Sequence, residues 1–299
     1  MVEKRDIRER ETIAPQDVVR LNFIRDTGGA YVFRAHLRRG LRSHLMEVLH
    51  GADVKRESSG VLVDGIRRYP RAEPVKMLRL FRRRFPGVEA AVEEIRRFKK
   101  IRRLLTSRHL AISNEFLVDY RVGERCDTLL CGLQEFVHGI ELDPWHPAPM
   151  RYLGDQYDAL THPAHTTMPV RTDWFARLRD SIDDFTGRLK KLVRQEALIP
   201  DLAGVRNLLV TRRGQVKLVD INNISAAPRG SEIRLDDLGY PVADKSLEVI
   251  GRLETHCLGR TIEGEGFYRP LFDRKRRARV QVLARAFHDY ICSMGMCDE

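Results

Sequence analysis

Three side chains that could hold a metal ion or move a proton lie close together in the stretch Leu198–Asn222, LIPDLAGVRNLLVTRRGQVKLVDIN. They are Asp201, Asn207 and Asp220, and each stands beside an apolar run. Two short apolar segments joined by a turn that contains Gly214 predict a β-hairpin between Asn207 and Asp220. Because a hairpin brings its ends together, the amide oxygen and the carboxylate would converge. Mg²⁺ prefers oxygen ligands of this kind.

Asp201 lies in the loop before this hairpin, where a carboxylate could orient an attacking hydroxyl and accept its proton. The same residue types have an ordinary structural use. Asp and Asn flank turns because their side chains form hydrogen bonds with the nearby backbone. On these residues alone, a catalytic loop and plain turn chemistry are equally open.

The elements that must position these residues can be read from the apolar spacing. Strands are expected over 60–66, 74–81, 116–122 and 128–137. A helix is expected over 87–105, and a long second helix is expected to begin at Thr172, a plausible N-cap.

Upstream of these elements, leucines recur every four residues from Leu37 to Leu49 and predict an amphipathic helix over 34–51. Residues 1–20 are expected to form a loosely packed arm. The order of elements then predicts an α+β fold with a strand-rich half before a mostly helical half. The expected divisions are 1–50 (arm and helix), 51–137 (smaller lobe) and 138–299 (larger lobe).

The order Asp, Asn, hairpin, Asp resembles the catalytic and metal-binding loops of the protein-kinase-like superfamily. Asp220 follows Asn207 by 13 positions, which suits the hairpin of that pattern. Ile199 and Pro200 replace the usual His-Arg before the catalytic Asp, and five residues rather than four precede the Asn. The wording is similar to that of bacterial kinase-like proteins such as the PhoP regulatory network family. The resemblance implies a two-lobed kinase-like fold.

A kinase-like fold also needs a strand lysine paired with a glutamate on the next helix. Lys76 lies in the expected strand PVKMLRLF with apolar neighbours on both sides. On the following helix, the 3.6-residue period places Glu94 on the apolar stripe and Glu93 on the charged face. A carboxylate on a buried face needs a partner, so the resemblance implies that Lys76 pairs with Glu94.

The segment QEFVHG resembles the hinge between kinase lobes, where backbone groups of Glu135 and Val137 would hold adenine. The resemblance therefore implies an ATP- and Mg²⁺-dependent phosphotransferase. Asp201 would orient the acceptor hydroxyl, and Asn207 and Asp220 would ligate Mg²⁺. Lys76 would hold the nucleotide phosphates. The acceptor is open among an anionic small molecule, a lipid-linked molecule and a protein.

Two alternatives stay open. No GxGxxG loop occurs, and the spacing between the expected catalytic Asp and Asn is longer than usual. These departures favour a pseudokinase, a regulatory nucleotide-binding module without catalysis. The second alternative is a basic nucleic-acid-binding protein, against which stand the few aromatics among the basic runs and the absence of a recognised binding motif.

Composition sets outer bounds on the function. The 299 residues carry a formal net charge of +11, with a pI near 9.7, which favours an anionic partner such as a nucleotide or the surface of an acidic membrane. The five cysteines form no CxxC pair, so reduced thiols are expected. The charged N-terminus has no apolar core of a secretory signal, and no stretch is long and apolar enough to span a bilayer. A cytoplasmic location is expected.

Overall fold

The computed structural model describes residues 6–21, 24, 29–37, 40–122, 124–157, 160 and 170–293. The chain forms two compact units, one of residues 1–96 with 112–136 and the other of residues 97–111 with 137–299. Helix α3 (Val88–His109) crosses from the first unit into the second. The fold is mixed α+β, with a sheet-rich N-terminal half and a helical C-terminal half, as the order of elements predicts.

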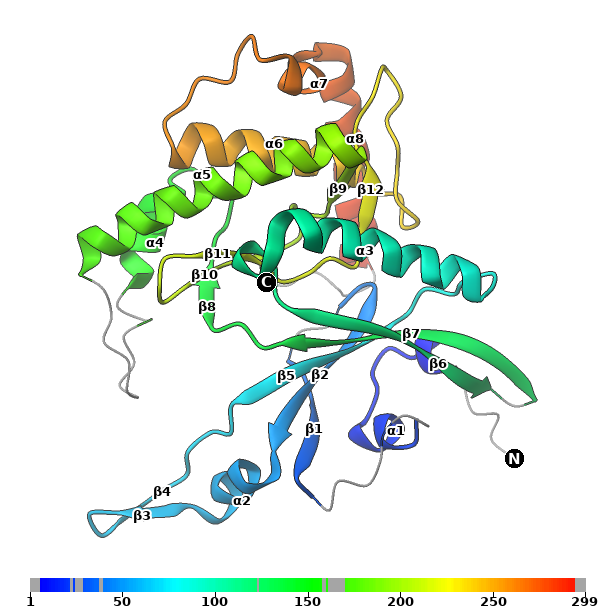
Figure 1. Ribbon diagram of the computed structural model, residues 1–299, viewed down its shortest axis with the longest axis vertical. Helices are drawn as coiled ribbons and strands as arrows, with labels where there is room; N and C mark the ends of the chain where they lie inside the picture. Colours follow the sequence, from blue (N-terminus) through cyan, green and yellow to red (C-terminus); the bar gives the residue numbers. More distant parts are fainter. Residues whose placement is uncertain are drawn as a thin grey trace. The chain divides into compact units, whose positions relative to one another are not determined.

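The first unit is built on a five-stranded antiparallel sheet, shown in blue to green in Figure 1. The strand order is β1-β2-β5-β7-β6. The bounds are β1 (Tyr31–Ala35), β2 (Ser43–His50), β5 (Pro74–Phe81), β6 (Ser113–Val122) and β7 (Arg125–Glu135). β5 is the central strand and pairs with β2 on one side and β7 on the other. The expected strand over 74–81 therefore matches β5 at both ends.

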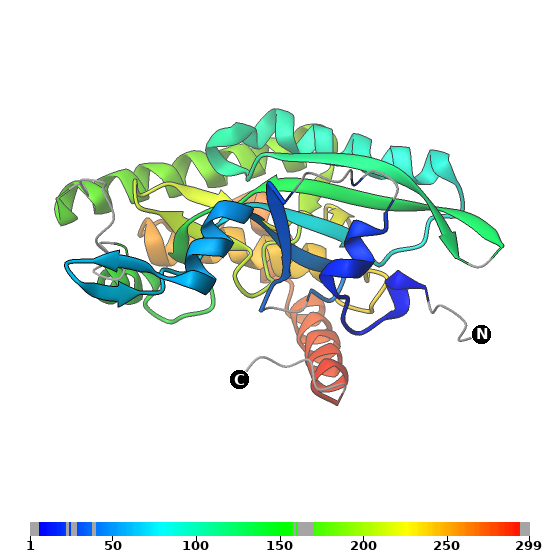
Figure 2. The ribbon, with the colours of Figure 1, turned by 90° about the horizontal axis from the view of Figure 1, so that it is seen from below.

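Side chains alternate between the two faces of this sheet. Leu78 and Leu80 of β5 point to one face, where they pack with Met46 and Val48 of β2. The N-terminal segment, with η1 (Ile7–Glu9) and α1 (Pro15–Val19), covers this face. Figures 1 and 2 show the sheet between α1 and the first half of α3, so these two elements lie on opposite faces.

The amphipathic helix expected over 34–51 is wrong, because this region forms the end of β1 and all of β2. A four-residue spacing is even, so it fits the two-residue alternation of a strand as well as a helix. Met46 and Val48 are buried beside Leu49, because the strand has covered faces on both sides. The arm is also well packed in its described part, where Ile7 and Val18 are buried.

A short inserted segment lies between β2 and β5 in the chain. It contains α2 (Gly51–Ser59) and a hairpin of β3 (Val61–Val63) and β4 (Ile66–Arg68). A single strand was expected over 60–66. The turn at Asp64 and Gly65, both with positive φ, divides that segment into the two strands.

The second unit is mainly helical, and its described residues also form two small sheets. Its helices are α4 (Pro149–Gln156), α5 (Arg171–Glu196), α6 (Val242–Arg252), η3 (Leu253–Cys257), η4 (Gly266–Tyr268), α7 (Arg269–Phe272) and α8 (Arg274–Ser293). Its strands are β8 (Gly139–Glu141), β9 (Leu198–Pro200), β10 (Leu208–Thr211), β11 (Val216–Leu218) and β12 (Ile224–Ala226). The order β11-β10-β8 forms one sheet, and β9 pairs with β12.

Helix α5 supports the loop of interest. It buries the predicted apolar face, including Trp174, Phe185 and Leu189. Its N-cap is Val170 rather than the expected Thr172. At its other end Ala197 adopts the left-handed conformation, with φ of 54°, and turns the chain into β9.

The end of α3 is attached to the hairpin of β10 and β11 through His109. This imidazole is fully buried and has Asp184 Oδ2 at 2.9 Å and the carbonyl oxygen of Val216 at 3.1 Å. Burial lowers the pKa of His109, although Asp184 opposes this shift. Two residues further on, the N–H of Ala111 donates to Leu218. These contacts fix the hairpin that precedes Asp220.

The described residues include no helix with the length and hydropathy of a transmembrane segment. Cys126, Cys131 and Cys257 are free thiols, as expected, and burial raises the pKa of Cys131 to about 12. Cys292 is disulfide-bonded, which departs from the expectation of reduced thiols.

Candidate active site

The loop after β9 holds Asp201 in a tight turn. Its Oδ1 accepts hydrogen bonds from the backbone N–H groups of Ala203, at 2.9 Å, and Gly204, at 3.2 Å. Its own N–H donates to the carbonyl oxygen of Asn223 at 2.9 Å, next to the pairing of β9 with β12. The turn role that residue type alone allows is therefore present. It also fixes the direction in which the half-buried carboxylate projects.

Asn207 connects this turn to the hairpin. Its Nδ2 donates to the carbonyl oxygen of Asp201 at 3.0 Å, and its own carbonyl accepts from the N–H of Val219 at 2.9 Å. The side chain is buried against Gly204, where an added Cβ would lie 2.6 Å from Nδ2. A glycine is therefore required at 204 for Asn207 to reach the loop of Asp201.

Asp220 follows the second strand of the hairpin, as predicted. The register pairs Leu208 with Leu218, so the residues flanking the hairpin lie at one end of it. The Oδ1 of Asp220 accepts from the N–H of Asn222 at 2.9 Å. Asn207 thus contacts the turn of Asp201 through its side chain and the residue before Asp220 through its backbone carbonyl, which brings the three predicted residues into one local assembly.

The donor set of this assembly bears on a metal ion. Because Nδ2 of Asn207 donates to the chain, Oδ1 is the atom of that amide that could accept or ligate. An amide oxygen with the Asp220 carboxylate fits a Mg²⁺ ion that takes its remaining ligands from phosphate and water. The described residues contain no group of three or more His, Cys, Asp or Glu side chains arranged for a metal.

The surroundings of Asp201 are acidic. Burial raises the pKa of the Tyr240 phenol, and the charges of Asp201, Glu248 and Asp236 raise it further. Asp236 accepts at Oδ1 from the N–H groups of Leu238 and Tyr240, both at 2.9 Å. Asp236 therefore caps a turn. The negative charge near Asp201 would attract a cation.

The expected hinge lies where β7 ends. β7 stops at Glu135, and Val137 opens the second unit. The N–H of Glu135 already donates to the carbonyl oxygen of Ile112 at 2.8 Å. A backbone contact with adenine at this residue would therefore have to use its carbonyl group.

Glu94 and Glu93 differ in burial as the helical period predicts. Glu94 is 5% exposed, whereas the side chain of Glu93 is 53% exposed and pairs with Arg96 at 3.1 Å. The partner of Glu94 differs from the expected one, because its Oε2 lies 3.5 Å from the Arg83 guanidinium. No hydrogen bond or ion pair in the described part of the chain joins Lys76 to Glu94.

Strand alternation explains the missing pair. Lys76 shares its face of β5 with Leu78 and Leu80, and this is the face that α1 covers. The first half of α3, which carries Glu94, lies on the other side of the sheet in Figures 1 and 2. Lys76 is exposed and directed away from that side. The helical period places Glu94 on the buried face of α3, but the two-residue period of β5 places Lys76 on the opposite side of the sheet.

Arg79 is a buried cation of β5 that the sequence reasoning did not consider. It is 2% exposed and lies on the face opposite Lys76. The register places it across Gly132 of β7 from Glu115 of β6. A Cβ on Gly132 would lie 3.8 Å from both Arg79 Nε and Glu115 Oε1, so the glycine leaves room for both side chains above it. The sequence signal for a buried Arg79 is its position between two apolar residues, Leu78 and Leu80, of an expected strand.

Neither a scan against protein-family models nor a search of curated proteins finds a match to this chain.

Proposed function

We propose that the protein is an ATP- and Mg²⁺-dependent phosphotransferase with a two-lobed fold of the protein-kinase-like class. The observation that carries the proposal is the position of Asn207. The buried residue binds the loop of Asp201 through its side-chain amide. Its backbone carbonyl accepts a hydrogen bond from Val219, the residue before Asp220. A base candidate and two metal-ligand candidates are thereby gathered at one end of a hairpin, in the chain order of a kinase catalytic loop.

The architecture of the first unit supports the same class. Its central strand β5 is followed by a helix with a buried glutamate, then by β6 and β7 of the same sheet. Kinases place a cation on such a strand and its glutamate partner on such a helix. On this proposal the cation that β5 presents to the α3 side is Arg79, in place of Lys76.

Asp201 would act on the acceptor. Its carboxylate would accept the proton of the acceptor hydroxyl while the hydroxyl oxygen bonds to the γ-phosphorus and the bond to the ADP oxygen breaks. Asn207 and Asp220 would hold Mg²⁺, which supplies charge neutralisation at the phosphates. The acceptor class stays open among an anionic small molecule, a lipid-linked molecule and a protein.

The test is calorimetric titration of ATP with Mg²⁺ or with EDTA. Asp220→Ala should remove the Mg²⁺-dependent part of the affinity, because it deletes the charged ligand of the proposed seat. Asp155→Ala provides a matched control, since it removes an exposed carboxylate on α4 of the same unit. Equal Mg·ATP affinity for wild type and Asp220→Ala would refute the metal assignment.

A second candidate is a nucleotide-binding module without catalysis. It is favoured by the turn hydrogen bonds at Oδ1 of Asp201 and by the direction of Lys76 away from α3. ATP binding that depends on Mg²⁺, with no phosphate transfer to water or to any acceptor class, would support this candidate over the enzyme.

A further inference from the structure

The first unit contains a cavity of about 1180 Å³ between α1 and the sheet. Apolar side chains of the sheet, such as Phe33, Val48 and Phe116, form one wall, and Val19 at the end of α1 contributes to the other. The volume is above the usual range for small-molecule pockets, about 300–1,000 Å³. A mostly apolar lining with a few polar groups is typical of such sites.

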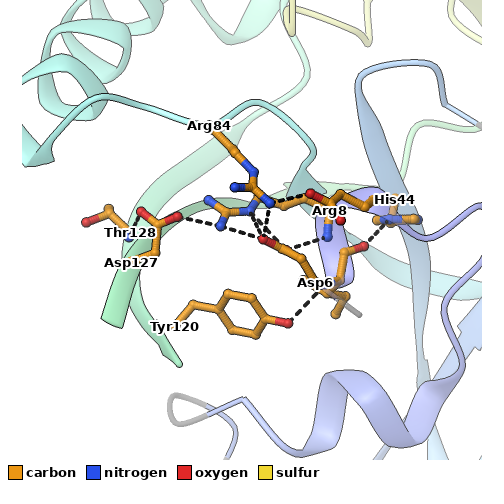
Figure 3. Close-up of polar contacts among 9 residues, drawn as sticks. Asp6, Arg8, His44, Arg84, Tyr120, Asp127 and Thr128 are labelled. Carbon is orange, nitrogen blue, oxygen red and sulfur yellow. Dashed lines mark hydrogen bonds and ion pairs between the residues drawn. The ribbon is translucent and has the colours of Figure 1, made fainter. Parts of the chain in front are cut away.

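The wall formed by α1 is fixed in place by the segment before it. Figure 3 shows Arg8 between the carboxylates of Asp6 and Asp127. Its Nη2 lies 2.7 Å from Asp6 and 2.5 Å from Asp127 on β7. Arg84 also reaches Asp6, at 2.9 Å. Burial alone would raise the pKa of Asp6, but the hydrogen bonds and charge of Arg8 lower it below its ordinary value.

Two neutral hydrogen bonds continue this attachment. The N–H of Ile7 donates to the Tyr120 hydroxyl at 3.0 Å, and Nε2 of His44 lies 2.8 Å from the carbonyl oxygen of Ile7. Because a carbonyl only accepts, the buried His44 donates from Nε2. The segment ahead of α1 is therefore attached to the sheet at both its side chains and its backbone.

The charged side chains among the described lining residues of the cavity have one sign. Arg20 and Lys76 are cationic, and none of these lining residues is a carboxylate. Lys76 lies opposite Glu135 in the strand register, but Glu135 does not line the cavity. Lys76 is exposed, and within the described part of the chain its ammonium group forms no hydrogen bond or ion pair.

We propose that this cavity binds a single acyl chain that carries an anionic head group. The apolar walls of α1 and the sheet would hold the chain, and Lys76, with Arg20, would receive the carboxylate or phosphate of the head. This inference is independent of the proposed phosphotransfer, because the cavity lies wholly within the first unit and its binding requires neither ATP nor Mg²⁺.

The test is equilibrium binding to the full chain without nucleotide, read by displacement of a fluorescent fatty acid, with all ligands below their micelle concentrations. Palmitate and hexadecyl phosphate should bind saturably, and hexadecanol and hexadecyltrimethylammonium should bind at least fivefold more weakly. Shortening the carboxylate chain should weaken binding by about threefold to fourfold per methylene, the value expected for a buried CH₂. The tighter of the two anions identifies whether a fatty acid or a phospholipid-type head is the source.

Two variants separate this site from nonspecific adsorption. Lys76→Glu should weaken palmitate binding about fivefold or more, because an attraction becomes a repulsion. Lys55→Glu is the matched control on α2, since it changes charge equally at an exposed lysine outside the cavity. Val19→Trp, at a 54% exposed position on the cavity wall, should reduce binding by filling space without disturbing the core.

Several results would overturn the proposal. They are absence of saturable palmitate binding, equal affinity for the anionic, neutral and cationic heads, and equal losses in Lys76→Glu and Lys55→Glu. Thermal unfolding of each variant reports whether the fold is retained, and a folded Val19→Trp with full affinity would also exclude this cavity. A failure here leaves the Mg·ATP titration unaffected, so the two proposals can fail separately.

Discussion

The hairpin loop of the second unit and strand β5 of the first unit carry predicted site residues with different outcomes. In the loop, the hairpin predicted between Asn207 and Asp220 is present, and Asn207 also joins the turn of Asp201 to the chain before Asp220. On β5, Lys76 lies on the face away from α3, and Glu94 pairs with Arg83. The loop residues are connected by a short, continuous piece of chain, whereas the strand and helix residues meet only through sheet geometry.

The difference shows which inferences a sequence supports. A hairpin turn constrains its own ends, so residues flanking it come together with little help from the rest of the molecule. A strand residue can point to either face, and a shift of one position reverses its direction. Substitutions in the loop are therefore expected to change catalysis most, and substitutions in the sheet unit to change stability.

The largest expected effect tests the loop. Asp201→Asn keeps the size of the side chain and an Oδ1 that can accept from Ala203 and Gly204, but it removes the charge that accepts a proton. We expect phosphate transfer to fall by roughly 10²-fold or more, the usual range for removal of a general base. Affinity for Mg·ATP and the melting temperature should change little.

Single-turnover kinetics with calorimetric ATP binding would measure both quantities on one preparation. If Asp201→Asn transfers phosphate at the wild-type rate, turn formation is the whole role of this residue. That result would favour a nucleotide-binding module without catalysis over the phosphotransferase.

The second prediction concerns the glycine beneath Asn207. Gly204→Ala places a Cβ 2.6 Å from Nδ2 of Asn207, so the buried amide must move. We expect a loss of roughly 2 kcal/mol in the free energy of unfolding, within the range for overpacking, together with weaker Mg·ATP binding. Gly187→Ala is the control, because Gly187 is an exposed position of α5 and an added Cβ there has open space. This change should stabilise the helix by roughly 0.5–1 kcal/mol. Urea unfolding of the two variants in parallel measures the contrast, and equal stabilities would contradict the packing argument.

The elements with strong local patterns were predictable. The bounds of β5 and the hairpin of β10 and β11 agree with expectation, and the buried face of α5 follows its 3.6-residue period. The helix expected over 34–51 failed because even spacing suits two periods, and only the neighbours of β2 in the sheet decide between them.

Residues buried by long-range packing were not predictable from local patterns. Arg79 is 2% exposed on the central strand of the sheet, and the buried Arg8 pairs with Asp127, 119 positions away in the chain. The cavity beside α1 likewise depends on where the arm docks. The local sequence around each of these residues does not indicate which distant segment packs against it.

The third prediction tests the attachment of the arm to the sheet unit. Burial and the charge of Arg82 lower the pKa of His44 from 6.5 to about 4. The unfolded chain therefore binds a proton first as pH falls, so this residue stabilises the fold above about pH 6.5 and ceases to do so as pH approaches 4. Between pH 7 and 5 its share of the loss should be roughly 2 kcal/mol.

His44→Gln retains an N–H donor for Ile7 and does not titrate, so its unfolding free energy should depend less on pH over this range. Urea unfolding at pH 7, 6 and 5 measures the slope for both proteins. His109, whose pKa is also lowered by burial, leaves a residual slope in the variant. Parallel pH profiles for wild type and His44→Gln would contradict a neutral, buried His44.

The smallest expected effect sharpens the sheet side of the comparison at adjacent helix positions. Glu94→Gln preserves shape but removes the charge facing Arg83, whose side chain is 51% exposed, so the loss in unfolding free energy should be about 1 kcal/mol. Glu93→Gln removes a charge that is 53% exposed, and its effect should stay within about 0.5 kcal/mol.

A second measurement, the rate of phosphate transfer, distinguishes a packing role of Glu94 from a functional one. If Glu94 serves the nucleotide through a β5 cation, Glu94→Gln should also weaken phosphate transfer while Glu93→Gln does not. A stability loss at Glu94 with unchanged transfer would make its ion pair purely structural, and a larger effect at Glu93 would mean that α3 is rotated from the orientation described.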